Sequence, residues 1–462
     1  MSFRSSSPFA NATYRRLFTA QVIALMGTGL TTIALALLAH DLAGERAGVV
    51  LGTALALKMV AYVTLAPVVG AFAHRLPRKG LLVALDLGRA AMVLCLPFVD
   101  AIWQIYLLVF LVNACSAGFT PTFQATIPDI LTEEETYTKA LTWSRLAQDL
   151  EALASPLLAG LALLVLASSD LFVLNGLAFL GSAALVASLT LPRARAPERT
   201  GGWRANLSFG LGIFRRTPRL RGLMALNVTV ASASAMVIVN TVVIVQDRLG
   251  LGEGQTALAY GCAGIGSMVL ALALPRLLER VPERRIMLSG GLLLVAGLGG
   301  APFALGSMVT LGAVWALLGA GLSLAQTPAG RLLRRSCAAG DRPAVFSAQF
   351  ALSHLCWLVL YPLGGWLAGA LGVEAAFWMV GGVACVGLSL AAWLWPREDR
   401  LVLEHIHAAE DHEHPHVHDE HHPHDHEGWE GPEPHVHPHH HGAVRHAHPF
   451  VIDGHHPVWP TR

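Results

Sequence analysis

The chain has 462 residues, of which 54% are hydrophobic and only 14% are charged, and its formal net charge is +1. Soluble domains carry about 25% charged residues, so this deficit excludes a protein whose whole surface faces water. A net charge near zero gives no reason to expect a nucleic-acid partner. The sequence contains no P-loop motif, which argues against direct drive by ATP.

Apolar segments long enough to cross a bilayer recur from Leu17 to Trp395. Because a membrane-spanning helix needs about 20 mostly apolar residues, we predict an all-helical polytopic membrane protein with about twelve spans. In chain order, the predicted spans are residues 17–40, 48–73, 80–99, 102–125, 139–166, 169–190, 222–246, 254–277, 286–305, 308–328, 345–370 and 374–395.

The connections between these spans differ strongly in positive charge. One side carries basic clusters in residues 75–79, 193–221 and 276–285, whereas the other side carries Arg46 and Arg248. The positive-inside rule places the basic connections in the cytoplasm. We therefore predict a multi-pass protein of the bacterial inner (cytoplasmic) membrane with both termini on the cytoplasmic side.

The same pattern divides the chain into two six-helix halves. We predict an N-terminal half at 1–190, a central cytoplasmic loop at 191–221, a C-terminal half at 222–396 and a His-rich disordered tail at 397–462. Within the loop, Trp203–Phe214 is amphipathic. This segment either lies on the inner leaflet of the membrane or forms a structured linker between the halves. Duplicated halves are one way to build an alternating-access transporter, with substrate bound near the midplane.

Two basic loops occupy corresponding places in the two halves, at residues 70–79 and 275–285. The first resembles the signature loop of the major facilitator superfamily, which has Gly, Asp, Arg and two further basic residues at fixed spacing. The residues that match this pattern are Gly70, Arg75, Arg78 and Lys79. His74 stands where the family usually has Asp.

Other features extend this resemblance over about residues 10–397. Asp86-Leu-Gly-Arg89 opens the third span, and Ser155-Pro156 lies in a segment similar to a motif of antiporters. As a whole, the chain resembles major-facilitator nickel-resistance exporters that end in a His-rich tail. The resemblance implies the major facilitator fold and efflux of nickel.

Most of the 22 His residues lie in the tail, between His405 and His456. Neutral imidazole binds Ni²⁺, Cu²⁺, Zn²⁺ and Co²⁺ well, and the interspersed Pro residues prevent a helix. The candidate metal ligands are His412, His414, His416, His418, His421, His422, His424, His426, His435, His437, His439, His440 and His441. We expect several exchangeable sites for nickel, cobalt or zinc, weakened below about pH 6.5. The alternatives are a polar tail without a metal role and a pH sensor.

Ionisable residues inside the spans are candidates for transport, because charge is costly to bury in lipid. Arg145 and Asp149 are four residues apart and pair on one helix face, whereas Glu151 points elsewhere. Asp149 and Glu151 are the main candidates for carrying metal or protons. The alternative is a structural ion pair near the cytoplasmic end of the span.

Other predicted spans also contain candidate ionisable residues. Asp86 and Arg89 in the third span belong either to the transport machinery or to a structural contact between helices. His354 in the eleventh span is either a ligand facing the pore or a core histidine. Lys58 stands alone in the second span, where we expect an acid from another helix to pair with it.

The sequence predicts a secondary exporter of a divalent metal, nickel first and cobalt or zinc next, working as a proton-coupled antiporter. The alternative is an exporter of an organic solute or metal chelate, such as a drug or siderophore, with the tail as a metal sensor. A membrane-tethered metal-storage protein is a third hypothesis. We expect a monomer that is not an enzyme and requires no cofactor, with lipid, protons and metal ions as its partners.

Overall fold

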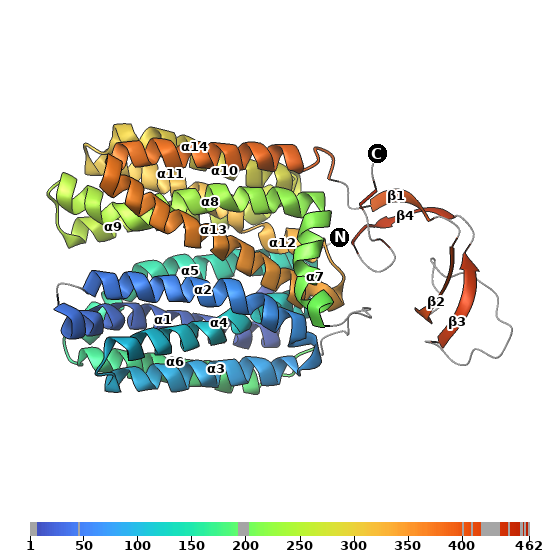
Figure 1. The fold of residues 1–462 in the computed structure, drawn as a ribbon, viewed down its shortest axis with the longest axis horizontal. Helices are drawn as coiled ribbons and strands as arrows, with labels where there is room; N and C mark the ends of the chain where they lie inside the picture. Colours follow the sequence, from blue (N-terminus) through green and yellow to red (C-terminus); the bar gives the residue numbers. More distant parts are fainter. Residues whose placement is uncertain are drawn as a thin grey trace.

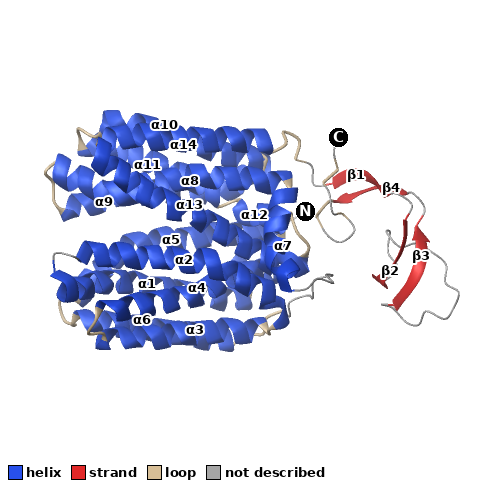
Figure 2. Cartoon of the chain, in the orientation of Figure 1, coloured by secondary structure: helices blue, strands red, loops and turns tan. Residues whose placement is uncertain are grey.

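The computed structural model describes residues 7–44, 47–192, 203–399, 402–407, 410–416, 435–441, 444–452, 456 and 459–460. Over these residues the protein is a bundle of long helices, with strands confined to the C-terminal segment (Figure 1, Figure 2). Eleven of the described helical segments are long and apolar enough to cross a membrane. The prediction of an all-helical polytopic membrane protein is confirmed.

The long helices form two groups, which we call the N-terminal half and the C-terminal half (Figure 1). The N-terminal half contains α1 (Ala12–Ala43), α2 (Ala47–Phe72), α3 (Arg78–Cys95), α4 (Ile102–Ile130), α5 (Glu134–Ala162) and α6 (Ser168–Ala187). The C-terminal half contains α8 (Pro218–Val242), α9 (Glu253–Arg280), α10 (Glu283–Ala304), α11 (Met308–Gln326), α13 (Arg342–Leu371) and α14 (Val373–Leu394).

Shorter elements connect and extend these helices. They are the 3₁₀ turns η1 (Pro8–Ala10), η3 (Ala73–Arg75), η4 (Leu96–Phe98) and η6 (Ala339–Asp341), the π-helical turn η5 (Val243–Arg248), and the helices α7 (Trp203–Arg216) and α12 (Ala329–Arg334). The helices α7 and α12 lie at the end of the bundle that also holds both termini (Figure 1). We call this the basic end, because it carries Arg78, Arg331, Arg334, Arg335 and Arg342.

Each predicted span falls on one of the long helices, but some ends differ. The predicted span 139–166 corresponds to α5 at Glu134–Ala162. Glu134 and Glu135 in its first turn favour a helix N-terminus electrostatically, although they lower the local hydropathy. The helix α5 is not among the eleven apolar segments, and it carries Arg145, Asp149 and Glu151 within two turns.

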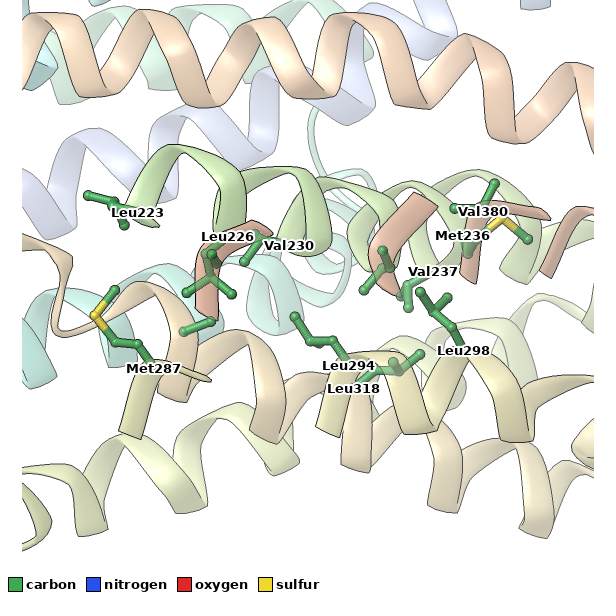
Figure 3. Close-up of a cluster of buried hydrophobic side chains, with 14 of the residues drawn as sticks. Leu223, Leu226, Val230, Met236, Val237, Met287, Leu294, Leu298, Leu318 and Val380 are labelled. Carbon is green, nitrogen blue, oxygen red and sulfur yellow. The ribbon is translucent and has the colours of Figure 1, made fainter. Parts of the chain in front are cut away.

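The largest core cluster fills the C-terminal half around α8. Leu226, Val230 and Val237 of α8 are buried against Leu294 of α10 and Leu318 of α11 (Figure 3). In the most apolar stretch of α8, 72% of residues are buried, compared with 22% in α9. The helix α8 therefore lies inside its half, while most residues of α9 are half-buried or exposed.

Small residues allow α9 and α11 to approach each other closely. A Cβ atom added to Gly319 would clash with the carbonyl oxygen of Ala263, and one added to Gly266 would clash with that of Ala316. Helices in a bilayer associate through van der Waals packing, since lipid is as apolar as their side chains. The close backbone contact between α9 and α11 therefore stabilises the C-terminal half through van der Waals packing.

The amphipathic segment of the central loop forms α7, which lies across the basic end and packs against α2 and α13 (Figure 1). Its apolar residues Ile213 and Phe214 are 1% and 2% exposed and belong to the core of the C-terminal half. Because α7 buries these apolar residues against protein, the structure favours a structured linker over a helix that lies on the inner leaflet.

The described parts of the tail form two small antiparallel sheets. The strand β1 (Val402–His407) pairs with β4 (Val444–Pro449), and β2 (Glu410–His416) pairs with β3 (His435–His441). The sequence predicts an extended and disordered tail, and the structure describes extended segments that pair with each other. Beyond β4, Phe450 and Ile452 are buried against the bundle.

Candidate functional site

Ion pairs join the two halves at the basic end. Asp129, near the end of α4, accepts hydrogen bonds from Arg78 at the start of α3 and from Arg342 at the start of α13. Arg331 of α12 pairs with Glu134 at the start of α5. Since α12 and α13 belong to the opposite half from α4 and α5, these contacts close the bundle at this end.

The predicted signature loop takes part in this closure. A Cβ atom on Gly70 would meet the side chain of Ser347 and lie 3.1 Å from the carbonyl oxygen of Pro343, so glycine permits α2 to approach α13. Arg78 is buried in its ion pair, whereas Arg75 and Lys79 are exposed. His74 lies in η3, and its side chain falls outside the described residues.

A cavity of about 520 Å³ lies between the halves, from the basic end to the middle of the bundle. Its walls come from α1, α2, α4 and α5 on one side and α8, α11, α12 and α13 on the other. Amide side chains line much of it: Gln21, Gln124, Gln148, Asn227, Gln326 and Gln349. Its charged lining residues are Lys58 and Arg145, and none of the described lining residues is Asp or Glu.

One wall of the cavity is aromatic. Along α13, the residues Phe350, His354, Trp357 and Tyr361 follow at helical spacing, and each lines the cavity. The His354 ring centroid lies 4.1 Å from that of Phe350 and 4.7 Å from those of Trp357 and Tyr62 of α2. These rings form an apolar surface with polar edges, which suits a planar or partly apolar organic group.

His354 is fixed by this aromatic cluster. Its Nδ1 lies 2.7 Å from the carbonyl oxygen of Phe350, so Nδ1 carries the proton that it donates and Nε2 is left as the acceptor. A single imidazole is a poor site for a metal ion. Within the parts of the chain that the structure describes, no group of three or more His, Cys, Asp or Glu residues is placed to hold one.

Two hydrogen-bond donors belong to residues that line the cavity. The ammonium group of Lys58 lies 5.7 Å from the ring centroid of Tyr62 and interacts electrostatically with the carboxylate of Glu151, although no direct ion pair joins it to a described carboxylate. The indole Nε1 of Trp357 is buried and has no hydrogen-bond partner among the described residues. Buried donors are normally satisfied, so the Trp357 indole lacks an expected acceptor, while the half-buried ammonium group of Lys58 presents a positive charge to the cavity.

Arg145 and Asp149 form the predicted pair, with a nitrogen–oxygen distance of 3.2 Å. The hydroxyl of Ser267 on α9 accepts from Arg145 Nε at 3.0 Å and donates to Asp149 at 2.6 Å. Arg145 also donates to Gln326 of α11 at 2.8 Å. The pair is therefore part of the contact between the halves, and Asp149 lies behind the cavity wall.

Glu151 points in a different direction, as predicted. A Cβ atom on Gly29 of α1 would lie 2.8 Å from its carboxylate, and the hydroxyl of Ser155 lies 3.5 Å from it. Asp86 and Arg89 pair inside the N-terminal half, where Ser182 donates to Asp86 at 2.7 Å. None of these acids lines the cavity.

The predicted tail ligands are described only in part. His412, His414 and His416 lie on β2, and His435, His437, His439, His440 and His441 lie on β3, while their side chains are not described. The register places His412 opposite His439, His414 opposite His437 and His416 opposite His435. His418, His421, His422, His424 and His426 lie outside the described residues.

Several residues of the site were not singled out from sequence. Asp129 follows Pro128 at the end of an apolar span, and no local signal marks it as the partner of two arginines. Tyr62, Trp357 and Tyr361 read as ordinary apolar positions in their spans. The cavity residues that the sequence did single out are Lys58, Arg145 and His354, and for Lys58 we expected a carboxylate partner.

Comparison with solved structures shows the fold. The human organic anion transporter MFSD10 (TETRAN) has a TM-score of 0.71 at 15% identity, covering 82% of this chain and 98% of that chain. A bacterial homologue of the iron transporter ferroportin in the outward-facing state gives 0.69 at 14% identity, covering 83% and 99%. FucP in the outward conformation gives 0.65 at 13% identity, covering 83% and 98%.

Comparison of sequences identifies the family. The chain is 24% identical over 328 residues, 69% of this chain and 78% of the relative, to the uncharacterized MFS-type transporter YfiS of Bacillus subtilis (strain 168). The model of the Major Facilitator Superfamily matches residues 17–314 and 224–431. This chain therefore belongs to the major facilitator superfamily, whose members are secondary transporters and not enzymes.

Proposed function

We propose that this protein exports anionic organic solutes with an aromatic or apolar part, metal chelates included, across a bacterial cytoplasmic membrane. The observation that carries the proposal is a cavity lined by Lys58, amide side chains and an aromatic wall, with no carboxylate among its described lining residues. An ammonium group in a low-dielectric site attracts a negative charge much more strongly than it does in water. The aromatic wall on α13 would then receive the apolar part of the solute.

A bare divalent metal ion fits this cavity less well. Such ions are held by several carboxylate, imidazole or thiolate ligands. The cavity offers one imidazole, whose ring is enclosed by aromatic neighbours, and two cationic side chains, of which Arg145 is already paired with Asp149. An anionic chelate needs no metal ligand from the protein, because the chelator supplies both the metal ligands and the negative charge.

The names of two of the similar structures refer to related substrates, which supports the proposal of anionic organic solutes and metal chelates. One of the similar structures is titled an organic anion transporter, and another a homologue of the iron transporter ferroportin. In our proposal the His-rich tail binds Ni²⁺, Co²⁺ or Zn²⁺ on the cytoplasmic side, where the positive-inside rule places the basic end. The tail then acts as a metal sensor or collector, and the cavity carries the chelate.

Export of the free divalent metal, coupled to inward proton flow, is the second candidate. The density of His residues between His405 and His456 favours it, and Asp149 and Glu151 would serve as the proton carriers. Under this hypothesis the ion would have to leave the tail and cross the bundle without a described multi-ligand site between the halves.

Efflux from proteoliposomes distinguishes the two candidates. Vesicles are loaded with Ni²⁺ alone, with a fluorescent aromatic carboxylate, or with Ni²⁺ in an anionic carboxylate chelate. We expect Lys58→Gln to weaken uptake of the two anions into the cavity about 10- to 100-fold, since hydrogen bonds to charged groups contribute about 1.5–3 kcal/mol. Lys139→Gln, in a surface ion pair with Glu135 outside the cavity, is the matched control. Transport of Ni²⁺ alone that is unaffected by Lys58→Gln, with no transport of either anion, would falsify the proposal.

A further inference from the structure

The C-terminal end of the chain returns to the bundle. Phe450 and Ile452 are each 2% exposed and join the core cluster of the C-terminal half. The ring centroids of His456 and Trp459 lie 4.8 Å and 5.1 Å from that of Phe450. We call these four residues the C-terminal anchor. The His-rich part of the sequence therefore lies between two described contacts with the bundle, the end of α14 and the C-terminal anchor.

The anchor docks on Arg219, the second residue of α8. The Arg219 side chain is fully buried, and its guanidinium carbon lies 4.9 Å from the centroid of the Trp459 ring. Its Nη2 donates to the carbonyl oxygen of Phe450 at 3.4 Å, and its Nη1 lies 3.5 Å from the carboxylate of Asp399. A buried guanidinium depends on such partners, because an uncompensated buried charge is strongly destabilising.

A series of ion pairs leads from Arg219 to the contact between the halves. Asp399 pairs with both Arg219 and Arg335. Arg335 pairs with Glu283 at 3.4 Å, and Glu283 pairs with Arg331 at 3.3 Å. Arg331 then pairs with Glu134 of the N-terminal half. The anchor is therefore connected, through side chains in direct contact, to an ion pair that closes the basic end.

We propose that the C-terminal anchor is a latch that stabilises the state in which the basic end is closed. Alternating access requires the halves to separate at this end, which breaks the pair between Arg331 and Glu134. Trp459 and Phe450 hold Arg219 and Asp399 in the arrangement that positions Arg335, Glu283 and Arg331 for that pair. Contacts that are more favourable in the closed state shift the conformational equilibrium toward that state. Loss of the anchor therefore raises the fraction of molecules that are open at the basic end.

Electron spin resonance distances in the full chain test this latch. Thr132 and Arg280 are exposed on opposite halves at the basic end, and each is replaced by Cys for spin labelling after substitution of the six native cysteines. In lipid nanodiscs, we expect Trp459→Ala to raise the ratio of long to short distances about two- to thirtyfold, the range for loss of a cation–π contact. Truncation after Pro449 should raise it at least as much.

Two matched variants show whether the effect belongs to the latch. Trp459→Tyr keeps an aromatic ring above Arg219 and should leave the distances near those of the parent chain. Trp103→Ala, which removes an exposed tryptophan at the opposite end of the bundle, should change nothing. Unchanged distances in Trp459→Ala overturn the latch, and this single substitution decides the matter even if the truncated chain fails to fold. Neither result depends on which solute the cavity carries.

Discussion

Asp129 of α4 and Arg342 of α13 form an ion pair across the boundary between the two halves. The same carboxylate pairs with Arg78, the buried arginine of the signature loop. One acid therefore ties the loop of the N-terminal half to the first turn of a helix in the other half. His74 stands where the family usually has an acid, and Asp129 supplies a carboxylate to this interface from another helix.

Asp129→Asn should open the basic end more often. The substitution leaves Arg78 and Arg342 close together without a compensating charge, and loss of one partner of a buried pair costs about 3–5 kcal/mol. Because Asp129 is 14% exposed, we expect the lower part of that range. Labelling of Thr327→Cys, a buried position in the cavity lining, by a membrane-impermeant thiol reagent applied from the basic side should become faster. Asp100→Asn, exposed at the opposite end, is the control, and equal labelling rates in both variants would contradict the role assigned to Asp129.

Gly70→Ala should weaken the same closed state by a steric route. The added methyl group would occupy the position of the Ser347 side chain, so α2 and α13 would have to separate. Overpacking of this kind costs about 1–3 kcal/mol. Gly80→Ala is the matched control in the same region, since the nearest atoms to its added carbon lie 4.0 Å away. The measurement is the spin-label distance at the basic end, and a shift in both variants or in neither would count against this contact.

Trp357→Phe should weaken binding of the anionic solute while preserving the fold. The change removes the buried Nε1 donor and keeps an aromatic ring in the wall of the cavity. A hydrogen bond to a charged acceptor contributes at least about 1.5 kcal/mol, so we expect affinity to fall about tenfold. Trp366→Phe, on the same helix but 66% exposed, serves as the control. Equal affinities for the parent and Trp357→Phe, measured by fluorescence titration, would show that the indole nitrogen does not meet the ligand.

Ni²⁺ binding by the purified full chain should depend on pH. Imidazole binds metal in its neutral form, and its ordinary pKa is about 6.5, so protons compete with Ni²⁺ as the pH falls through that value. Calorimetry should therefore find several Ni²⁺ ions bound at pH 7.5 and much weaker binding at pH 5.5. Replacement of the five His residues of β3 by Gln should lower the number bound at pH 7.5. Tight binding that is the same at both pH values would exclude the tail as the site.

Much of the fold follows from the sequence, for a physical reason. A span such as 308–328 must be helical, because its backbone groups have no other hydrogen-bond partners in lipid, and the structure has α11 at Met308–Gln326. The ends of helices are less predictable where charge extends them, as Glu134 and Glu135 extend α5. The pairing of Arg145 with Asp149 was also predictable, since their four-residue spacing is a local property.

The cavity could not be derived in the same way. Lys58, Trp357 and Asn227 belong to α2, α13 and α8, and no local spacing brings them together. We expected a carboxylate opposite Lys58, because an unpaired ammonium group is costly to bury in lipid. The structure places the ammonium group in the lining of a polar cavity, where Tyr62 is its neighbour and Glu151 of α5 is the acid that interacts with it electrostatically. The docking of Trp459 on Arg219 is likewise a contact between residues that are far apart in the sequence.

The most direct test of the proposed function is efflux of an anionic chelate of Ni²⁺ compared with that of Ni²⁺ alone, for the parent protein and Lys58→Gln in proteoliposomes. The cavity with Lys58 in its lining predicts that the parent exports the chelate much faster than the free ion, and that Lys58→Gln loses this preference while Lys139→Gln retains it. Efflux of free Ni²⁺ at a rate equal to or above that of the chelate, and indifferent to Lys58→Gln, would contradict the account.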